Sequence, residues 1–208
     1  GVGGALAQHA EQLLESLPEA DRPLVREAFR HLVTADGTRA IITREELEQI
    51  LGGPHHDVAR AGRVLDCLID GRLLVASEGT GAAVRLEVIH EMLLLSWPRL
   101  VKWLREDAEH ARMRDQLRAA ARQWHERGRA RGLLWREEAL AEYRLWRARY
   151  DGQLTKLEQA FGDVSLAAER RSQRIRRMLA GIAIAALVTG LVVLFQAQRR
   201  TEAQRTVA

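Results

Sequence analysis

Cysteine is nearly absent from this chain of 208 residues, which contains Cys67 and no other. A single cysteine excludes an internal disulfide and fits a reducing compartment such as the cytoplasm. Because Cys67 falls in a helical pattern beside Val64 and Leu68, we interpret it as a packed thiol rather than a nucleophile. Lysine is also scarce, since 30 of the 32 basic residues are arginine. A GC-rich bacterial genome produces that bias, so it has no functional weight.

Sequence signatures of catalysis are missing as well. No glycine-rich loop is followed by Lys and Ser or Thr, so the phosphate cradle of a P-loop is absent. No serine or cysteine lies in a nucleophile motif. His55 and His56 are adjacent in a Gly-Pro turn, but without further ligands at metal spacing they indicate a solvated loop. We therefore predict that this segment is not an enzyme by itself, and that it contains no catalytic residue, no metal ligand and no cofactor of its own.

Charge is distributed unevenly along the chain. Residues 1–96 contain 9 basic and 15 acidic side chains, whereas residues 97–208 contain 23 basic and 13 acidic ones. The net charge of +4 is therefore the sum of an acidic first half and a basic second half. We interpret the two halves separately.

The first half has the pattern of a small helical domain that ends in a β-hairpin. Apolar residues recur at helical spacing, and Thr43 with Glu46 forms a capping box. Gly79 to Gly81 marks the turn between two short strands. The expected helices cover residues 5–17, 21–33, 44–51 and 58–69, and the expected strands cover residues 40–42, 73–75 and 84–88. Helix, short strand, two helices and hairpin is the order of a winged helix-turn-helix domain, which we predict for residues 1–96.

The second half predicts a helical bundle over residues 97–165. One long helix is expected from Trp97 to about Arg127, where a glycine-containing segment interrupts the pattern. A second helix contains aromatic residues at spacings of three and four, and a third begins near Leu154. An aromatic stripe at this spacing is typical of a packed core, so we assign these side chains to packing. Their aromatic members are Tyr143, Trp146, Tyr150 and Phe161.

An uncharged run of eighteen residues extends from Met178 to Phe195. As a helix it spans about 27 Å, close to the roughly 30 Å of a bilayer's hydrocarbon core. The alternative is a buried core helix that is apolar all round. We predict a transmembrane helix over residues 178–197, preceded by a basic juxtamembrane helix over 166–177 and followed by a linker over 198–208. The predicted fold class is therefore mainly α: a winged helix with a small hairpin wing, a helical bundle and one transmembrane helix.

Arginines on the two sides of this run predict its orientation. Five lie between Arg170 and Arg177, and three follow the run. The segment that flanks a membrane span on the cytoplasmic side usually contains more Lys and Arg than the segment on the other side. We therefore expect a single-pass protein of the bacterial cell membrane, in contact with the lipid bilayer and with its N-terminal part in the cytoplasm. Small residues four apart, such as Gly181 and Ala185, are compatible with oligomerisation.

The segment from Val88 to Leu104 resembles a known family. Ile89-His90-Glu91-Met92-Leu93-Leu94-Leu95-Ser96-Trp97-Pro98 is similar to the winged-helix region of STAND-class signal-transduction ATPases, the group that includes NACHT and NB-ARC proteins. It most resembles the bacterial novel-STAND branch, where a His-Glu-Ala-Leu-Leu-like motif precedes a tryptophan and a proline. Met92 departs from the alanine of that motif. In many relatives an arginine-rich stretch, one membrane span and a WD-repeat propeller follow.

The resemblance implies a role for His90. In these ATPases a Met-His-Asp-like motif at the end of the winged helix reaches bound ADP, and Ile89-His90-Glu91 fits that position. The alternative is a histidine that caps its own helix or packs against the hairpin. The resemblance further implies that the full-length parent is an ATPase that binds ADP or ATP with Mg²⁺, and that its core lies before Gly1.

Three functions are compatible with these patterns. The first is a regulatory and membrane-anchoring segment of a STAND-type NTPase, in which the winged helix senses the ADP/ATP state of the upstream core. The second is a membrane-tethered winged-helix transcription regulator. The acidic first half argues against DNA binding, because neutralisation of phosphates dominates the affinity for DNA. The third is a structural linker.

Overall fold

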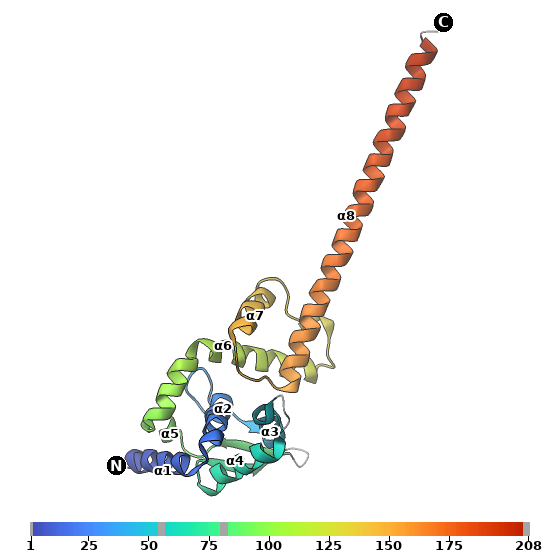
Figure 1. Ribbon diagram of the computed structural model, residues 1–208. Helices are drawn as coiled ribbons and strands as arrows, with labels where there is room; N and C mark the ends of the chain where they lie inside the picture. The colour runs from blue at the N-terminus through green and yellow to red at the C-terminus, as the bar shows by residue number, and fades with distance from the viewer. Residues whose placement is uncertain (1, 54–56, 80–82, 206–208) are drawn as a thin grey trace. The chain divides into compact units, whose positions relative to one another are not determined.

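The computed structural model describes residues 2–53, 57–79 and 83–205, with side chains described as far as Leu191. The described chain is mainly helical and contains a three-stranded sheet, in agreement with the mainly α prediction. The helices, shown in Figure 1, are α1 (Val2–Ser16), α2 (Arg22–Leu32), α3 (Arg44–Gly52), α4 (Val58–Asp70), α5 (Glu91–Ser96), α6 (Pro98–Glu126), α7 (Glu137–Arg149) and α8 (Lys156–Arg205). The strands are β1 (Ile42–Thr43), β2 (Leu74–Glu78) and β3 (Val84–Val88), and short 3-10 helices cover Glu19–Asp21 and Arg131–Leu133.

The predicted hairpin is confirmed, and a third strand joins it. The strand order is β1-β3-β2, with both pairings antiparallel. Leu74 pairs with Val88 at one end of the hairpin, and Ile42 pairs with Leu86 on the other side of β3. Of the predicted turn, residues 80 and 81 lie outside the described residues. The pairing of β1 with β3 brings the chain after α2 alongside the end of the hairpin.

The predicted capping box at the start of α3 is confirmed. The Glu46 backbone N–H donates to the Thr43 hydroxyl at 3.2 Å, and the Thr43 N–H donates to the Glu46 carboxylate at 3.3 Å. Each bond satisfies an amide at a helix terminus that has no partner within the helix. α3 therefore begins directly at the end of β1.

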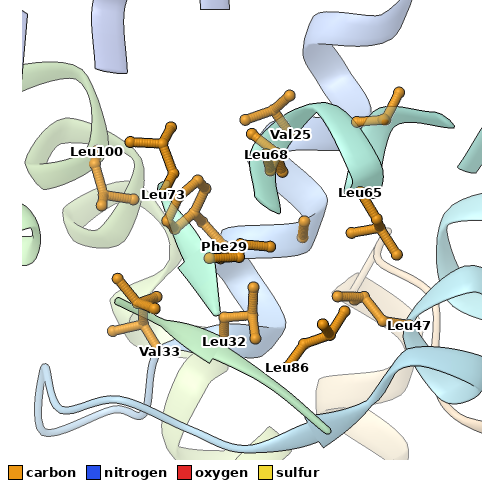
Figure 2. Close-up of a cluster of buried hydrophobic side chains, with 14 of the residues drawn as sticks. Val25, Phe29, Leu32, Val33, Leu47, Leu65, Leu68, Leu73, Leu86 and Leu100 are labelled. Atoms are coloured by element: carbon orange, nitrogen blue, oxygen red, sulfur yellow. The ribbon is translucent and has the colours of Figure 1, made fainter. Parts of the chain in front are cut away.

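The core around the sheet is made mainly of aliphatic side chains from helices α1 to α6 and the hairpin. Figure 2 shows Phe29 and Leu32 of α2 beside Leu73 and Leu86 of the hairpin. Phe29, Leu32 and Leu86 have no exposed surface, and Leu73 is 1% exposed. The hydrophobic periodicity that predicted these helices therefore also identified the faces that they bury.

Trp97 attaches the beginning of α6 to this core. Its side chain is fully buried and packs edge-on against Phe29 and Trp103, with ring centroids 5.5 and 5.6 Å away. The indole N–H donates to the Glu11 carboxylate of α1 at 2.8 Å, and Arg99 binds the same carboxylate. Burial alone would raise the pKa of Glu11, but the bonds from Trp97 and Arg99 lower it.

The predicted aromatic core of the bundle is confirmed. Trp146 and Tyr150 stack with ring centroids 4.5 Å apart. Trp135 packs edge-on against both Tyr143 and Phe161. Tyr143, Trp146, Tyr150 and Phe161 are all at most 5% exposed. Such ring pairs add to the free energy gained by burying apolar surface.

The transmembrane prediction is wrong. Among the described residues, no helix is long and apolar enough to cross a membrane. Arg176 and Arg177 lie directly before Met178, so charged side chains bound the apolar stretch of α8 on that side.

The predicted membrane localisation and the orientation depended on that span, so they are corrected with it. From Val192 onward the side chains of the predicted span lie outside the described residues. The chain divides into two compact units, residues 1–162 and residues 163–208. In the second unit α8 continues without interruption to Arg205.

Candidate functional site

His90 lies between the end of β3 and the start of α5, where the sequence placed it. The Ile89 backbone N–H donates to the Leu73 carbonyl at 3.1 Å, one step beyond the last hairpin pair. His90 has an extended backbone, with φ −133° and ψ 128°, and its carbonyl accepts the Leu93 N–H at 3.0 Å. Backbone hydrogen bonds therefore hold the chain on both sides of the histidine.

Buried side chains anchor the same junction. Val88 precedes His90 and is fully buried, while Leu93 and Leu94 follow it and are 1% and 4% exposed. Met92 and Leu95, on the other face of α5, are 51% and 75% exposed. α5 is thus held to the core by one side, and its other side is open to a partner or to water.

The His90 side chain itself is exposed and forms no hydrogen bond with any residue that the structure describes. It does not cap α5, although it occupies the N-cap position. The alternative in which His90 caps its own helix is therefore wrong. The His90 residue is exposed, so its ring can meet a group from outside this chain segment.

Charges of both signs lie close to His90. The Arg39 guanidinium donates to the Val88 carbonyl at 3.3 Å and lies 3.7 Å from the Glu87 carboxylate. Glu91 is exposed in the first turn of α5. Sequence reasoning missed Arg39, because no local pattern marks it and only the pairing of β1 with β3 brings it to the hairpin.

Other groups that the sequence singled out show no sign of a site. Within the described ranges, no group of His, Cys, Asp and Glu side chains could hold a metal ion. His55 and His56 lie outside those ranges. Cys67 is a free, half-buried thiol, and burial together with the nearby charge of Asp70 raises its pKa. A raised pKa keeps the thiol protonated, which agrees with a packed cysteine rather than a nucleophile.

A surface hollow of about 500 Å³ lies beside the start of α6. Its lining residues are Arg26, Pro98, Arg99, Lys102, Trp103 and Glu106. Arg26 pairs with Glu106 at 2.7 Å, and Arg99 pairs with Glu11. Because these arginines already have carboxylate partners, the hollow presents little free positive charge to an anionic ligand.

The helix that would enter a DNA groove in a winged-helix regulator is α4. Arg60 of α4 is bound to the Asp21 carboxylate at 2.5 Å and to the Ala20 carbonyl at 2.6 Å. Asp66, on the same helix, holds Arg44 of α3 at 2.7 Å. The contacts of Arg60 direct its guanidinium toward partners within the protein and leave it less available to phosphates, whereas Arg63 of α4 is exposed.

Comparison with known families places the chain in a class. The family model described as Novel STAND NTPase 1 matches residues 1–132, so the chain belongs to this family. The STAND-class prediction is therefore confirmed at that level, over the sheet domain and α6. No curated protein matches the chain. No solved structure matches it either.

Proposed function

We propose that this chain is a regulatory segment of a STAND-type NTPase. In this proposal residues 1–96 form a winged helix that senses whether an ATPase core of the same protein holds ADP or ATP. The family match supports the NTPase context. The element order of helix, β1, α3, α4 and hairpin, with β1 paired to β3, supports the winged-helix assignment.

His90 is the residue that would sense the nucleotide. The observation that supports this role is an exposed imidazole with no described partner, placed on a junction that buried side chains and backbone bonds hold in position. A polar group on a rigid element needs little reorganisation to meet a ligand. A ring N–H of His90 would donate to a phosphate oxygen of ADP, and exchange for ATP would break that contact and release the winged helix.

The nucleotide and Mg²⁺ would be held mainly by the ATPase core, because this chain lacks a P-loop. The contribution of this chain would be one hydrogen-bond donor at the phosphates. Arg39 lies nearby but already pairs with the Glu87 carboxylate, whereas the carboxylate of Glu91 opposes an anion at this point. Replacement of Glu91 by Gln should therefore strengthen ADP binding slightly.

The test is His90→Ala in the full-length protein. Hydrogen bonds to charged groups contribute about 1.5–3 kcal/mol, which corresponds to roughly one to two decades in affinity. We expect ADP to bind about 10- to 100-fold more weakly, as measured by calorimetric titration. Because His90 is exposed and unpartnered, the thermal stability of the protein without nucleotide should stay unchanged.

His125→Ala is the matched control, since His125 is an exposed histidine of α6 remote in sequence from the hairpin. This variant should bind ADP like the wild type. An unchanged ADP affinity in His90→Ala would show that the histidine does not contact the nucleotide. The proposal would also fail if both histidine variants weakened binding equally.

A further inference from the structure

A buried cluster of charged side chains joins α2, α6 and the segment that leads into α8. We call it the ionic junction. Its members on α2 are Glu27, Arg30 and His31; those on α6 are Asp107, Arg114 and Arg118; Glu158 lies in the first turn of α8. His31 is fully buried, and Arg114 and Glu158 are each 1% exposed. Ionised side chains are rarely buried unless each has a partner, so each charge of the ionic junction depends on the others.

The hydrogen bond from Arg118 defines the tautomer of His31. Arg118 Nη2 lies 3.0 Å from His31 Nδ1, and a guanidinium can only donate. Nδ1 must therefore be the unprotonated, accepting nitrogen. The ring proton lies on Nε2, which is 3.4 Å from the Glu27 carboxylate. The buried imidazole is neutral in this arrangement and is held between a cation and an anion.

Arg118 links His31 to the first turn of α8. It also donates to the His31 carbonyl at 3.1 Å and to the Glu158 carboxylate at 3.1 Å. Glu158 in turn accepts the Thr155 N–H at 2.9 Å, and the Thr155 hydroxyl accepts the Glu158 N–H at 3.1 Å. One guanidinium therefore connects the end of α2 to the residues that begin α8.

Glu27 holds the same segment at a second point. Its carboxylate accepts the Gln153 backbone N–H at 3.4 Å and the Arg30 guanidinium at 2.7 Å. Arg30 also lies over the Tyr150 ring, 5.8 Å from its centroid. Residues 150–158 are thus bound to α2 through Glu27 and Arg30, and to both α2 and α6 through Arg118.

We propose that His31 is the proton-sensitive element of a latch, and that its protonation on Nδ1 detaches residues 150–158 from α2 and α6. A proton on Nδ1 would point directly at the Arg118 guanidinium. Two cations about 3 Å apart in a site closed to water repel strongly. Arg118 must then leave, and its bonds to the His31 carbonyl and to Glu158 are lost together.

The surrounding charges determine the direction of the pH response. Burial lowers the pKa of His31, Glu27 raises it, and the charges of Arg118 and Arg114 lower it, so that the net shift is downward. Arg30 and Glu158 also belong to the junction, and burial raises the pKa of Tyr150, which stays neutral. An opened segment exposes His31 with an ordinary pKa of about 6.5. The opened form therefore binds the proton more readily, and the closed form loses stability as the pH falls below about 6.5.

Hydrogen–deuterium exchange of residues 150–158 in the full chain tests this inference independently of the nucleotide proposal. Exchange is measured at about pH 7.5 and about pH 5.5 and corrected for intrinsic rates. In the wild type the opened population should rise about tenfold, one factor of ten for the pH unit between about 6.5 and 5.5. A wild-type segment that is equally protected at both pH values overturns the proposal.

Two variants and a control make the result specific. His31→Asn retains an acceptor near the Nδ1 position but does not titrate, so it should abolish the pH response. His9→Asn removes an exposed histidine, bonded to the Gly71 carbonyl at 2.7 Å, and should keep the full response. Arg118→Met should already open the segment at the higher pH, even if His31→Asn does not fold. A wild-type response in His31→Asn, or full protection in Arg118→Met, contradicts the latch.

Discussion

Around the sheet, the buried side chains are aliphatic almost throughout, whereas those between α6, α7 and the start of α8 include aromatic and charged residues beside aliphatic ones such as Leu117 and Leu140. Phe29 is the aromatic residue of helices α1 to α4 that joins the first core. The second interior contains Trp124, Tyr143 and Phe161 together with buried Arg114 and Asp107.

This difference predicts different responses to substitution. Truncation of a side chain in an aliphatic core lowers the stability by an amount that grows with the cavity left behind. Substitutions that conserve the side-chain volume are tolerated better. A buried ion pair depends on both partners, because removal of one leaves an uncompensated charge. Truncations in the sheet region should therefore lower the free energy of unfolding in proportion to the cavity that they create. In the bundle, removal of a single buried charge should lower it by several kcal/mol, about 3–5 kcal/mol.

The largest expected effect is that of Asp107→Ala. Asp107 binds Arg114 at 2.6 Å and Arg30 at 3.2 Å, so the variant leaves the buried Arg114 and the partly buried Arg30 without this partner. Removal of one partner from a buried pair costs about 3–5 kcal/mol. Urea denaturation should show that loss, whereas Glu109→Ala on the exposed face of α6 should change stability by no more than about 0.5 kcal/mol. Equal effects in the two variants would remove the distinction between the regions.

The double variant Asp107→Leu, Arg114→Met sharpens the same comparison. Replacing a buried ion pair by apolar side chains of similar volume is often neutral or stabilising. We expect the double variant to recover most of the stability that Asp107→Ala loses. The same denaturation experiment measures this recovery. If stability is not recovered, the ion pair stabilises the fold by more than the cancellation of two buried charges.

Leu32→Ala tests the aliphatic region. Leu32 has no exposed surface and lies within the core beside the hairpin (Figure 2). A leucine-to-alanine change in such a core costs about 3 kcal/mol through lost burial and the remaining cavity. Leu145, which is 67% exposed on α7, provides the control and should tolerate alanine with little change in the unfolding midpoint. A small effect at Leu32 would mean that this core rearranges to fill the space.

The smallest effect concerns the cap of α3. Thr43→Ala removes the acceptor for the Glu46 N–H and should cost about 1 kcal/mol. Thr43→Ser keeps a hydroxyl at the same place and should retain most of that stability in a thermal denaturation experiment. If serine and alanine were equally destabilising, the effect would come from the threonine methyl group rather than from the capping bond.

Local patterns in the sequence predicted most of the elements. The hairpin, the capping box at Thr43 and the long helix after Trp97 appear where the sequence placed them. Position within the chain also placed His90 at a strand-to-helix junction. The membrane span is the main error, because no helix among the described residues is long and apolar enough to cross a membrane.

The sequence by itself determined the helices, the strands and their buried faces, since these depend on interactions between residues three or four positions apart or on alternate positions of a strand. Only the tertiary structure decided which charges meet. Arg118 and His31 are separated by 87 positions and Arg39 and Val88 by 49, and no local periodicity encodes such pairs. They form because folding buries these groups together, and a buried charge requires a partner wherever in the chain that partner lies.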